Sequence, residues 1–395
     1  MRRKGIQNFL WISMFALLCM TQLQTQPCCT GASEPGCASL SKRIPVIYDS
    51  DIGDDIDDTW ALGFILQCPE LDVKLVVGDN GKPIYRAKLF AKFLEMTGNA
   101  HIPVGMAAGN NMGAGGNQSS WVKDYDLEQY PGTIHKDGVQ AIINTIMQSS
   151  EPITLLCVGP VPNIAEALRR EPAIAQKAKF VGMHGSVRLG YGGSKNIHAE
   201  YNVKKDIPAC QTVFKAAWPM TITPLDTCGL VVLKGDRYAK VRDALHPIAR
   251  AITENYQAWC VAQKNVDNNL HKRQSSTLFD TVAVYLTFCQ KLCQMEDLGI
   301  RVDDKGFTRI DANAKTVSVA TAWKDMGAFE DLLVHRVTGG YRMSEARRIA
   351  VDDVIPREAP VPSEPEQCWE PGPIANSRFT EEEMMQIKHR VRSPE

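Results

Sequence analysis

The sequence has almost no net charge. Its 395 residues include 44 Lys and Arg against 45 Asp and Glu. A chain without an excess of positive charge has no electrostatic footprint for nucleic acid or for an acidic membrane surface. With 44% hydrophobic residues it is long enough to bury a large core, as one large domain or two modest ones. We therefore expect no nucleic-acid partner, and a small molecule or a protein as the ligand.

Cysteines in the spacing of a zinc site are also missing. The chain has 12 cysteines, and no pair of them shows that spacing. Cys289 and Cys293 lie four residues apart on a predicted helix, a spacing more typical of a core than of a metal site. Cys28, Cys29 and Cys37 lie in a segment with Gly, Ser and Pro. Export would permit disulfides, whose pairing the sequence does not reveal.

The N-terminal apolar stretch, residues 9–20, is too short to span a bilayer comfortably. It follows a basic stretch at residues 2–4, which is the pattern of a secretory signal peptide. We predict a signal peptide over residues 1–25 and a spacer over 26–41, hence export to the periplasm or the cell exterior. The bulky Leu18 before Cys19 disfavours a lipoprotein box.

The rest of the chain shows no internal repeat, and strand-like and helical segments alternate along it. This pattern predicts an α/β fold with a mainly parallel central sheet covered by helices on both faces. In such folds ligands bind beyond the carboxyl ends of the strands. We expect one domain over residues 42–345 and a Pro- and Glu-rich tail over 346–395. The predicted strands are 44–48, 73–77, 101–107, 153–158 and 179–183, and the predicted helices are 59–66, 82–98, 134–149 and 161–170.

Two further regions have their own patterns. Residues 101–133 contain many Gly and Asn, which predicts a long loop. The chain from residue 237 is predicted to be mostly helical, with a β-rich interlude near 308–322.

Six aspartates crowd into ten positions at the end of the first predicted strand. Two unit charges about 4 Å apart repel by about 4 kcal/mol at an effective dielectric near 20. A solvated loop in which Asp57 or Asp58 caps the next helix would explain one or two of them. A hard-cation site, for Ca²⁺ or with stricter geometry for Mg²⁺, would explain more. The aspartates are Asp49, Asp51, Asp54, Asp55, Asp57 and Asp58.

Three uses of such a site compete on the residues alone. One is a metal-activated water with an aspartate as base. The second is an aspartyl-phosphate phosphatase with its Asp-x-Asp at a strand end. The third is a structural calcium loop.

The segment "YDSDIGDDIDDTWAL" resembles the N-terminal signature of the inosine-uridine-preferring nucleoside hydrolases, Asp-x-Asp-Pro-Gly-x-Asp-Asp-Ala. The match needs two inserted residues, and Ile52 replaces the usual Pro. Without the insertion, Asp55 and Ile56 would take the paired positions. The helical "TWALGFIL" that follows favours Asp57 and Asp58 as the pair, with Asp49, Asp51 and Gly53 before them.

Further segments resemble the family in the same order over about residues 44–340: "LVVGDN", "IPVGMAAG", "LLCVGPVPNIAEAL", "FVGMHG", "HAEYNV" and "LFDTVAVYL". The resemblance implies a nucleoside hydrolase-like α/β catalytic domain that hydrolyses the N-glycosidic bond of ribonucleosides with Ca²⁺ as cofactor, in purine or pyrimidine salvage. It implies that Asp51 is the base that activates a metal-coordinated water. It implies as metal ligands Asp51, Asp58, the Val158 carbonyl and Asp280.

The same resemblance implies a set of substrate-binding residues, with Asn80 as the alternative to Asp79. They are Asp57, Asp79, Met183, Glu200, Asn202 and Asp280.

Phe279 departs from the family, many of whose members carry a His there that helps the base leave. Replacements on the sequence are His135, His184, His198 and His271, and Tyr191 or Tyr201 is a candidate to stack on the base. A non-catalytic calcium- or ribosyl-binding protein, and a hydrolase of another N-ribosyl substrate, stay open. Base preference, expected to be set by loops 101–133 and 225–275, and a homo-oligomeric state stay open too.

Overall fold

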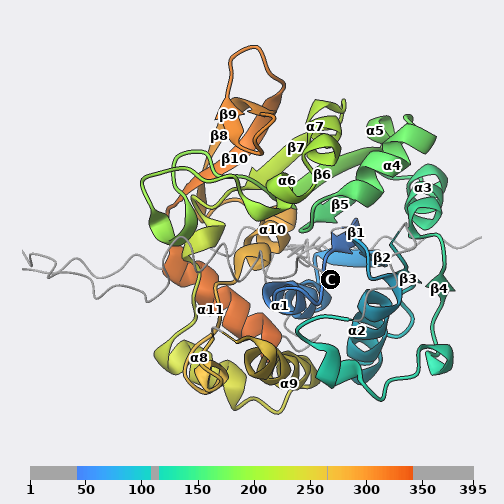
Figure 1. Ribbon diagram of the computed structural model, residues 1–395, viewed down its shortest axis with the longest axis vertical. Coiled ribbons are helices and arrows are strands. Elements are labelled where there is room, and N and C mark those ends of the chain that lie inside the picture. Colours follow the sequence, from blue (N-terminus) through green and yellow to red (C-terminus); the bar gives the residue numbers. More distant parts are fainter. Residues whose placement is uncertain (1–41, 108–114, 265, 341–395) are drawn as a thin grey trace, which may run out of the picture. The chain divides into compact units, whose positions relative to one another are not determined.

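The computed structural model describes residues 42–107, 115–264 and 266–340 (Figure 1). These residues form a ten-stranded sheet with the order β4-β3-β2-β1-β5-β6-β7-β10-β8-β9. In this spatial order, every pair of neighbours from β4 across to β10 is parallel. Strand β8 pairs antiparallel with β10, and β9 pairs antiparallel with β8 at the edge. The predicted α/β fold is confirmed. The strands are β1 Ile44–Ser50, β2 Leu71–Gly78, β3 Val104–Gly105, β4 Ile134–His135, β5 Ile153–Cys157, β6 Ala178–Met183, β7 Met220–Thr223, β8 Cys293–Val302, β9 Thr308–Ile310 and β10 Thr316–Trp323.

Helices cover both faces of this sheet, as Figure 1 shows. One core gathers under α1, α2 and α8 to α11, and the other under α3 to α7. Strand β1 feeds both, because successive side chains point to opposite faces: Val46 and Tyr48 lie in the first core and Ile47 in the second. The helices are α1 Asp57–Leu66, α2 Pro83–Met96, α3 Gly138–Gln148, α4 Pro162–Arg170, α5 Ile174–Lys177, α6 Tyr201–Lys205, α7 Ile207–Lys215, α8 Gly235–Arg242, α9 Pro247–Ala262, α10 Phe279–Phe288 and α11 Met326–Val337.

The chain order reverses at β1. Strand β2 pairs with one side of β1, and β5, which comes later in the chain, pairs with the other. Open parallel sheets bind ligands at such a switch point, beyond the carboxyl ends of the strands. The aspartate-rich segment follows β1 directly, so the fold places it at this position.

Several expected elements differ from the structure. The strand expected over 101–107 is reduced to Val104–Gly105, and the helix expected from residue 134 begins only at Gly138. Asp137 sets that start because its side chain accepts a hydrogen bond from the backbone N–H of Gln140. The β-rich interlude begins at Cys293, earlier than expected, and β7 was not predicted.

The helix expected to carry both Cys289 and Cys293 is wrong: α10 ends at Phe288, and Cys293 opens β8. Their expected place in the core is confirmed, since both are buried. All seven cysteines of the described ranges are buried and free.

No helix within the described residues has the length and apolar character needed to cross a membrane. The predicted signal peptide, spacer and tail lie outside the described residues, and all the predicted domain limits remain predictions.

Candidate active site

A cavity of about 200 Å³ lies beyond the carboxyl ends of β1, β5 and β6. The β1–α1 loop supplies one wall, and the first turns of α6 and α10 supply others. Segment 115–117 and Gln263 complete it. The lining residues are Asp51, Asp54, Asp55, Asp57, Asp58, Lys82, Gly115, Gly116, Asn117, Val158, Met183, Tyr191, Glu200, Tyr201, Asn202, Gln263, Phe279 and Asp280.

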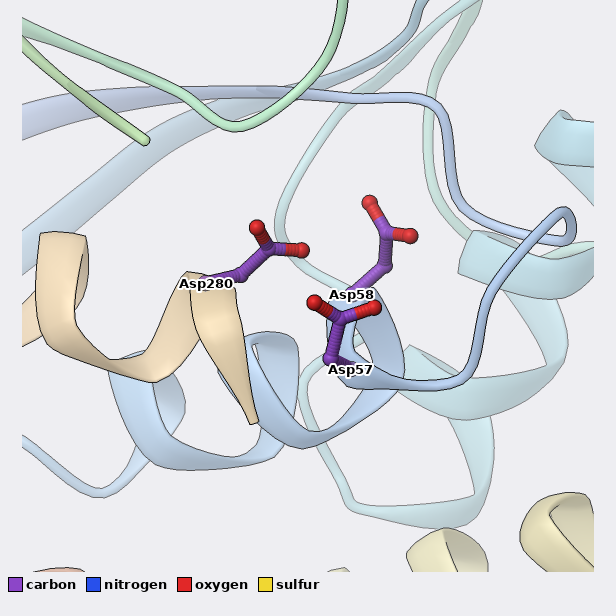
Figure 2. Close-up of side chains that lie close together, drawn as sticks. All are labelled: Asp57, Asp58 and Asp280. Atoms are coloured by element: carbon purple, nitrogen blue, oxygen red, sulfur yellow. The ribbon is translucent and has the colours of Figure 1, made fainter. Parts of the chain in front are cut away.

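Three buried carboxylates meet at this cavity. Asp57 and Asp58 open α1, Asp280 lies in the first turn of α10, and their oxygens lie within 4.8 Å of one another. Figure 2 shows the three side chains where the two helices meet. The alternative that Asp57 or Asp58 caps α1 is wrong, because the cap residue is Ile56 and no side chain caps it. Both lie within the helix, where its N-terminal dipole favours negative charge.

Burial and mutual repulsion disfavour the ionised form of these groups. Burial raises the pKa of Asp58 well above its usual range, and the charges of Asp51 and Asp57 add to the rise. Burial and the charges of Asp57 and Asp58 likewise raise the pKa of Asp280. Ser50 opposes this at Asp58 through a hydroxyl that donates to Oδ1 at 2.6 Å.

A divalent cation would remove this repulsion. The close donors are carboxylate oxygens, and oxygen ligands suit Ca²⁺ or Mg²⁺ rather than a soft metal. The residues present therefore fit a hard cation.

The other two expected metal ligands line the same cavity. Asp51 is 5% exposed, although its carboxylate is not part of the close trio. The Val158 carbonyl accepts a hydrogen bond from the Asn202 side-chain amide at 3.1 Å.

The expected ribose contacts Met183, Glu200 and Asn202 form one hydrogen-bonded wall. Asn202 donates to the carbonyls of Val158 and Met183. Glu200 caps α6 by accepting the backbone N–H groups of Asn202 and Val203, and it also accepts that of Gly185. This capping fixes the orientation of the Glu200 carboxylate.

Asp79 lies behind the wall of the cavity rather than in its lining. It accepts backbone N–H groups from Asn80 and Val161, and burial raises its pKa to about 6. Gly159 separates it from Asp51: a Cβ there would meet the Asp79 carboxylate at 2.8 Å and the Asp51 nitrogen at 3.0 Å. Asn80 is not in the lining either.

Arg86 was missed by the sequence analysis. Its guanidinium is fully buried and donates to the carbonyls of Asp51 and Ile52. It also donates to Asp54 Oδ2 at 3.0 Å, and Lys82 pairs with the other oxygen of Asp54 at 2.9 Å. Burial would raise the pKa of Asp54, but Arg86 and Lys82 outweigh it and lower that pKa. An arginine on the apolar side of a predicted amphipathic helix was the signal available.

Segment 115–118 was predicted as loop only, and it docks on the aspartate-rich segment. Asn117 donates to the Asp54 carbonyl at 2.7 Å, and Gln118 donates to the Asp55 carbonyl at 2.6 Å. The Tyr85 hydroxyl accepts the Gln118 N–H and donates to the Gly53 carbonyl. The segment therefore supports the loop that carries Asp54 and Asp55.

None of the candidate histidines lines the cavity as far as the described residues show. His184 is buried with Nε2 at 3.0 Å from the Gly159 carbonyl, and burial lowers its pKa to about 4. His198 accepts the Tyr191 N–H, His135 lies in β4, and the His271 ring packs against Tyr256. The candidate stacking residues Tyr191 and Tyr201 do line the cavity, together with Phe279.

Comparison with known families decides the relationship. Residues 46–331 match the family model described as inosine-uridine preferring nucleoside hydrolase. The chain belongs to this family. The family's curated ribonucleoside hydrolases act on N-glycosyl bonds, so membership places the chain among the N-glycosyl hydrolases and ends the phosphatase alternative.

Two curated relatives in the nucleoside hydrolase family are named for different substrate ranges. The non-specific ribonucleoside hydrolase RihC of Klebsiella pneumoniae is 30% identical over 206 residues, which are 50% of this chain and 66% of that protein. The pyrimidine-specific ribonucleoside hydrolase RihA of Citrobacter koseri is 26% identical over 230 residues, 53% of this chain and 69% of that protein. The alignments thus span about two thirds of these relatives.

Solved structures agree on the nucleoside hydrolase fold. A purine-preferring ribonucleoside hydrolase from Gardnerella vaginalis has a TM-score of 0.61 at 21% identity, covering 78% of this chain and all of that one. An inosine-uridine preferring nucleoside hydrolase from Bacillus anthracis has a TM-score of 0.58 at 18% identity, covering 75% of this chain and 99% of that one.

Proposed function

We propose that this protein hydrolyses the N-glycosidic bond of ribonucleosides to ribose and free base, with Ca²⁺ as its cofactor. The convergence of Asp57, Asp58 and Asp280 at the switch point, with Asp51 in the same cavity, supports the proposal most strongly. Ca²⁺ accepts several oxygen ligands in a flexible geometry, whereas Mg²⁺ requires a strict octahedron. A loop of carboxylates and a carbonyl therefore suits Ca²⁺ better than Mg²⁺.

In this proposal Asp51, Asp58, the Val158 carbonyl and Asp280 hold the cation. When bound, the cation supplies binding of the ribose hydroxyls and a lowered pKa for the attacking water. Asp51 takes the proton from that water while the water oxygen attacks C1′ of the ribose.

The wall of the cavity acts on the sugar. The carboxylates of Asp57 and Glu200 stabilise the positive charge that develops on the ribose ring in the oxocarbenium-like transition state. Asn202 and Glu200 bind ribose hydroxyls, so a deoxyribose would leave these buried polar groups unpaired. Asp79 acts from behind the wall by holding the turn that carries Gly159 and Val161.

The decisive experiment measures ribose release from inosine, adenosine, guanosine, uridine and cytidine, with calcium and with a chelator. Calcium-dependent release supports the hydrolase and ranks the bases. We expect Asp51→Ala to weaken calcium binding and, at saturating calcium, to reduce turnover by about 100- to 10,000-fold, as removal of a general base does. A folded, calcium-binding protein that releases no ribose would favour a binding role instead.

The export signal is part of the same proposal. Residues 1–25 would direct the hydrolase out of the cytoplasm, where it would act on nucleosides outside the cell or in the periplasm. N-terminal sequencing of the mature protein tests this.

A further inference from the structure

The cavity carries a large excess of negative charge. Seven of its lining residues are carboxylic acids, and Lys82 is the one cationic residue among the described lining residues. Lys82 is already paired with Asp54 at 2.9 Å. A bound divalent cation and the Arg86 guanidinium behind the wall would still leave the site net negative.

The described residues that line the cavity include no histidine, the side chain that most often protonates a departing group. Phe279 occupies the position before Asp280, and its ring packs edge-on against Tyr191 at 6.1 Å between centroids. The Tyr191 hydroxyl accepts the backbone N–H of Tyr201. No His or Cys is among the described lining residues. Residues 108–114 of the sequence are Ala, Gly, Asn and Met only.

These two features work against neutral bases. A neutral base leaves as an anion unless it is protonated, and an anion forming among carboxylates is electrostatically unfavourable. An aglycone that already carries a fixed positive charge leaves as a neutral molecule and needs no acid.

We propose that the preferred substrates of this site are N-ribosides with a cationic aglycone, of the pyridinium or N7-alkylpurinium type. The inference rests on the proposed hydrolase function and names its substrate class. The carboxylates attract the cation before the reaction, and Phe279 and Tyr191 in the lining supply the aromatic rings that cation–π contacts need.

The reaction balances without a co-reactant. The C1′–N bond breaks and both of its electrons go to the ring nitrogen, which neutralises the aglycone. The water oxygen forms the new bond to C1′, and Asp51 takes the water proton and releases it to solvent. The products are ribose, the neutral aglycone and one proton.

The first test compares kcat/KM for nicotinamide riboside and 7-methylguanosine with that for inosine and guanosine, all with calcium. We expect the cationic ribosides to be favoured by about 100-fold or more, the lower range of a general-acid contribution. Equal or better hydrolysis of inosine and guanosine would overturn the inference and leave the hydrolase proposal standing. Absence of hydrolysis of all four, and of adenosine, uridine and cytidine as well, would overturn the hydrolase proposal itself.

The variant Phe279→His separates the site's preference from the intrinsic reactivity of the substrates. It supplies an acid, so it should raise kcat for inosine and guanosine by about 10-fold or more and lower kcat/KM for nicotinamide riboside. A rise for both classes alike would contradict the inference.

A binding measurement needs no variant and no turnover. N1-methylnicotinamide and nicotinamide differ in a methyl group and a fixed charge. The calcium-loaded protein should bind the cation about 10-fold more tightly, as inhibition of ribose release or calorimetry would show. Equal or weaker binding of the cation would overturn the inference.

Discussion

Arg86 shows at the residue scale how a loop of aspartates can be buried. Its guanidinium holds the carbonyls of Asp51 and Ile52 and pairs with Asp54. The charges of Asp54 and Asp51 raise its own pKa against the opposing effect of burial, so it stays protonated. The Arg86 guanidinium therefore supplies the loop with a positive charge of the protein's own, at a fixed place.

Arg86→Met should destabilise the protein by about 3–5 kcal/mol, because it leaves a carboxylate and four backbone carbonyls without their buried partner. Lys82→Met is the matched control: that ion pair with Asp54 is nearer the surface and should cost at most about 1 kcal/mol. Urea unfolding with a chelator present measures both. Similar losses for the two variants would show that Arg86 has no special role.

The buried His184 makes the stability of the fold depend on pH, and in the opposite direction to the buried carboxylates Asp58 and Asp280. Its folded pKa of about 4 lies below the ordinary value of 6.5, so the unfolded chain binds the proton more readily. Stability from this group is intact above pH 6.5 and is lost as pH falls toward 4, by about 3 kcal/mol in all.

His184→Gln keeps a side-chain donor for the Gly159 carbonyl and removes the titration. The free energy of unfolding should then fall less between pH 7 and pH 4.5 than in the natural protein. Parallel pH profiles for the two proteins would refute this assignment.

At the scale of elements, the site exists because α1 and α10 begin side by side. Both helices start with acidic residues, Asp57 and Asp58 on one and Asp280 on the other. Without a cation, the repulsion among these residues opposes folding, which makes the two helix starts sensitive to metal and to pH.

Asp58→Asn should make the metal-free protein more stable by about 1–3 kcal/mol, since it removes one charge from a buried like-charged group. The proposed calcium binding should raise the Tm of the natural protein by mass action, and the variant should abolish most of that rise. Thermal unfolding with calcium and with chelator gives both values. A less stable metal-free variant would mean that Asp58 is held mainly by its bond from Ser50.

The chelated natural protein should gain stability as pH falls from 7.5 toward 5. The pKa values of Asp58 and Asp280 are raised in the folded state, so the folded chain binds these protons more tightly than the unfolded chain does. This stability is present at low pH and lost as pH rises through the raised values. The His184→Gln background removes the opposing titration, and calcium should abolish the gain.

Sequence patterns predicted the elements whose side chains alternate strongly between core and solvent or lie wholly in the core. Strand β1 and helices α1 and α2 fall close to their expected places. The two-residue strand β4 was missed and β3 was predicted too long, because so short an element owes its pairing to its neighbours. The site residues came from a motif, whereas Arg86 and segment 115–118 act through backbone carbonyls, which leave no motif.

For the whole molecule, residues 42–340 contain both cores and all the described residues that line the cavity. We expect the chain cut to 42–340 to fold and to keep calcium-dependent ribose release. Its seven cysteines are free and buried, so a reducing agent should leave its Tm unchanged. Calorimetry with and without reductant tests this, and a shift of several degrees would contradict it.

The positive charge of Arg86 also bears on how the loop responds to loss of the metal. The hydrogen bonds from Arg86 to the carbonyls of Asp51 and Ile52 involve no metal ion, so we expect the loop to keep its form when the metal leaves. Loss and recovery of the metal is then an exchange between two folded states. Under the proposed calcium dependence, we expect the protein to stay folded when calcium is scarce and to become active when the ion returns.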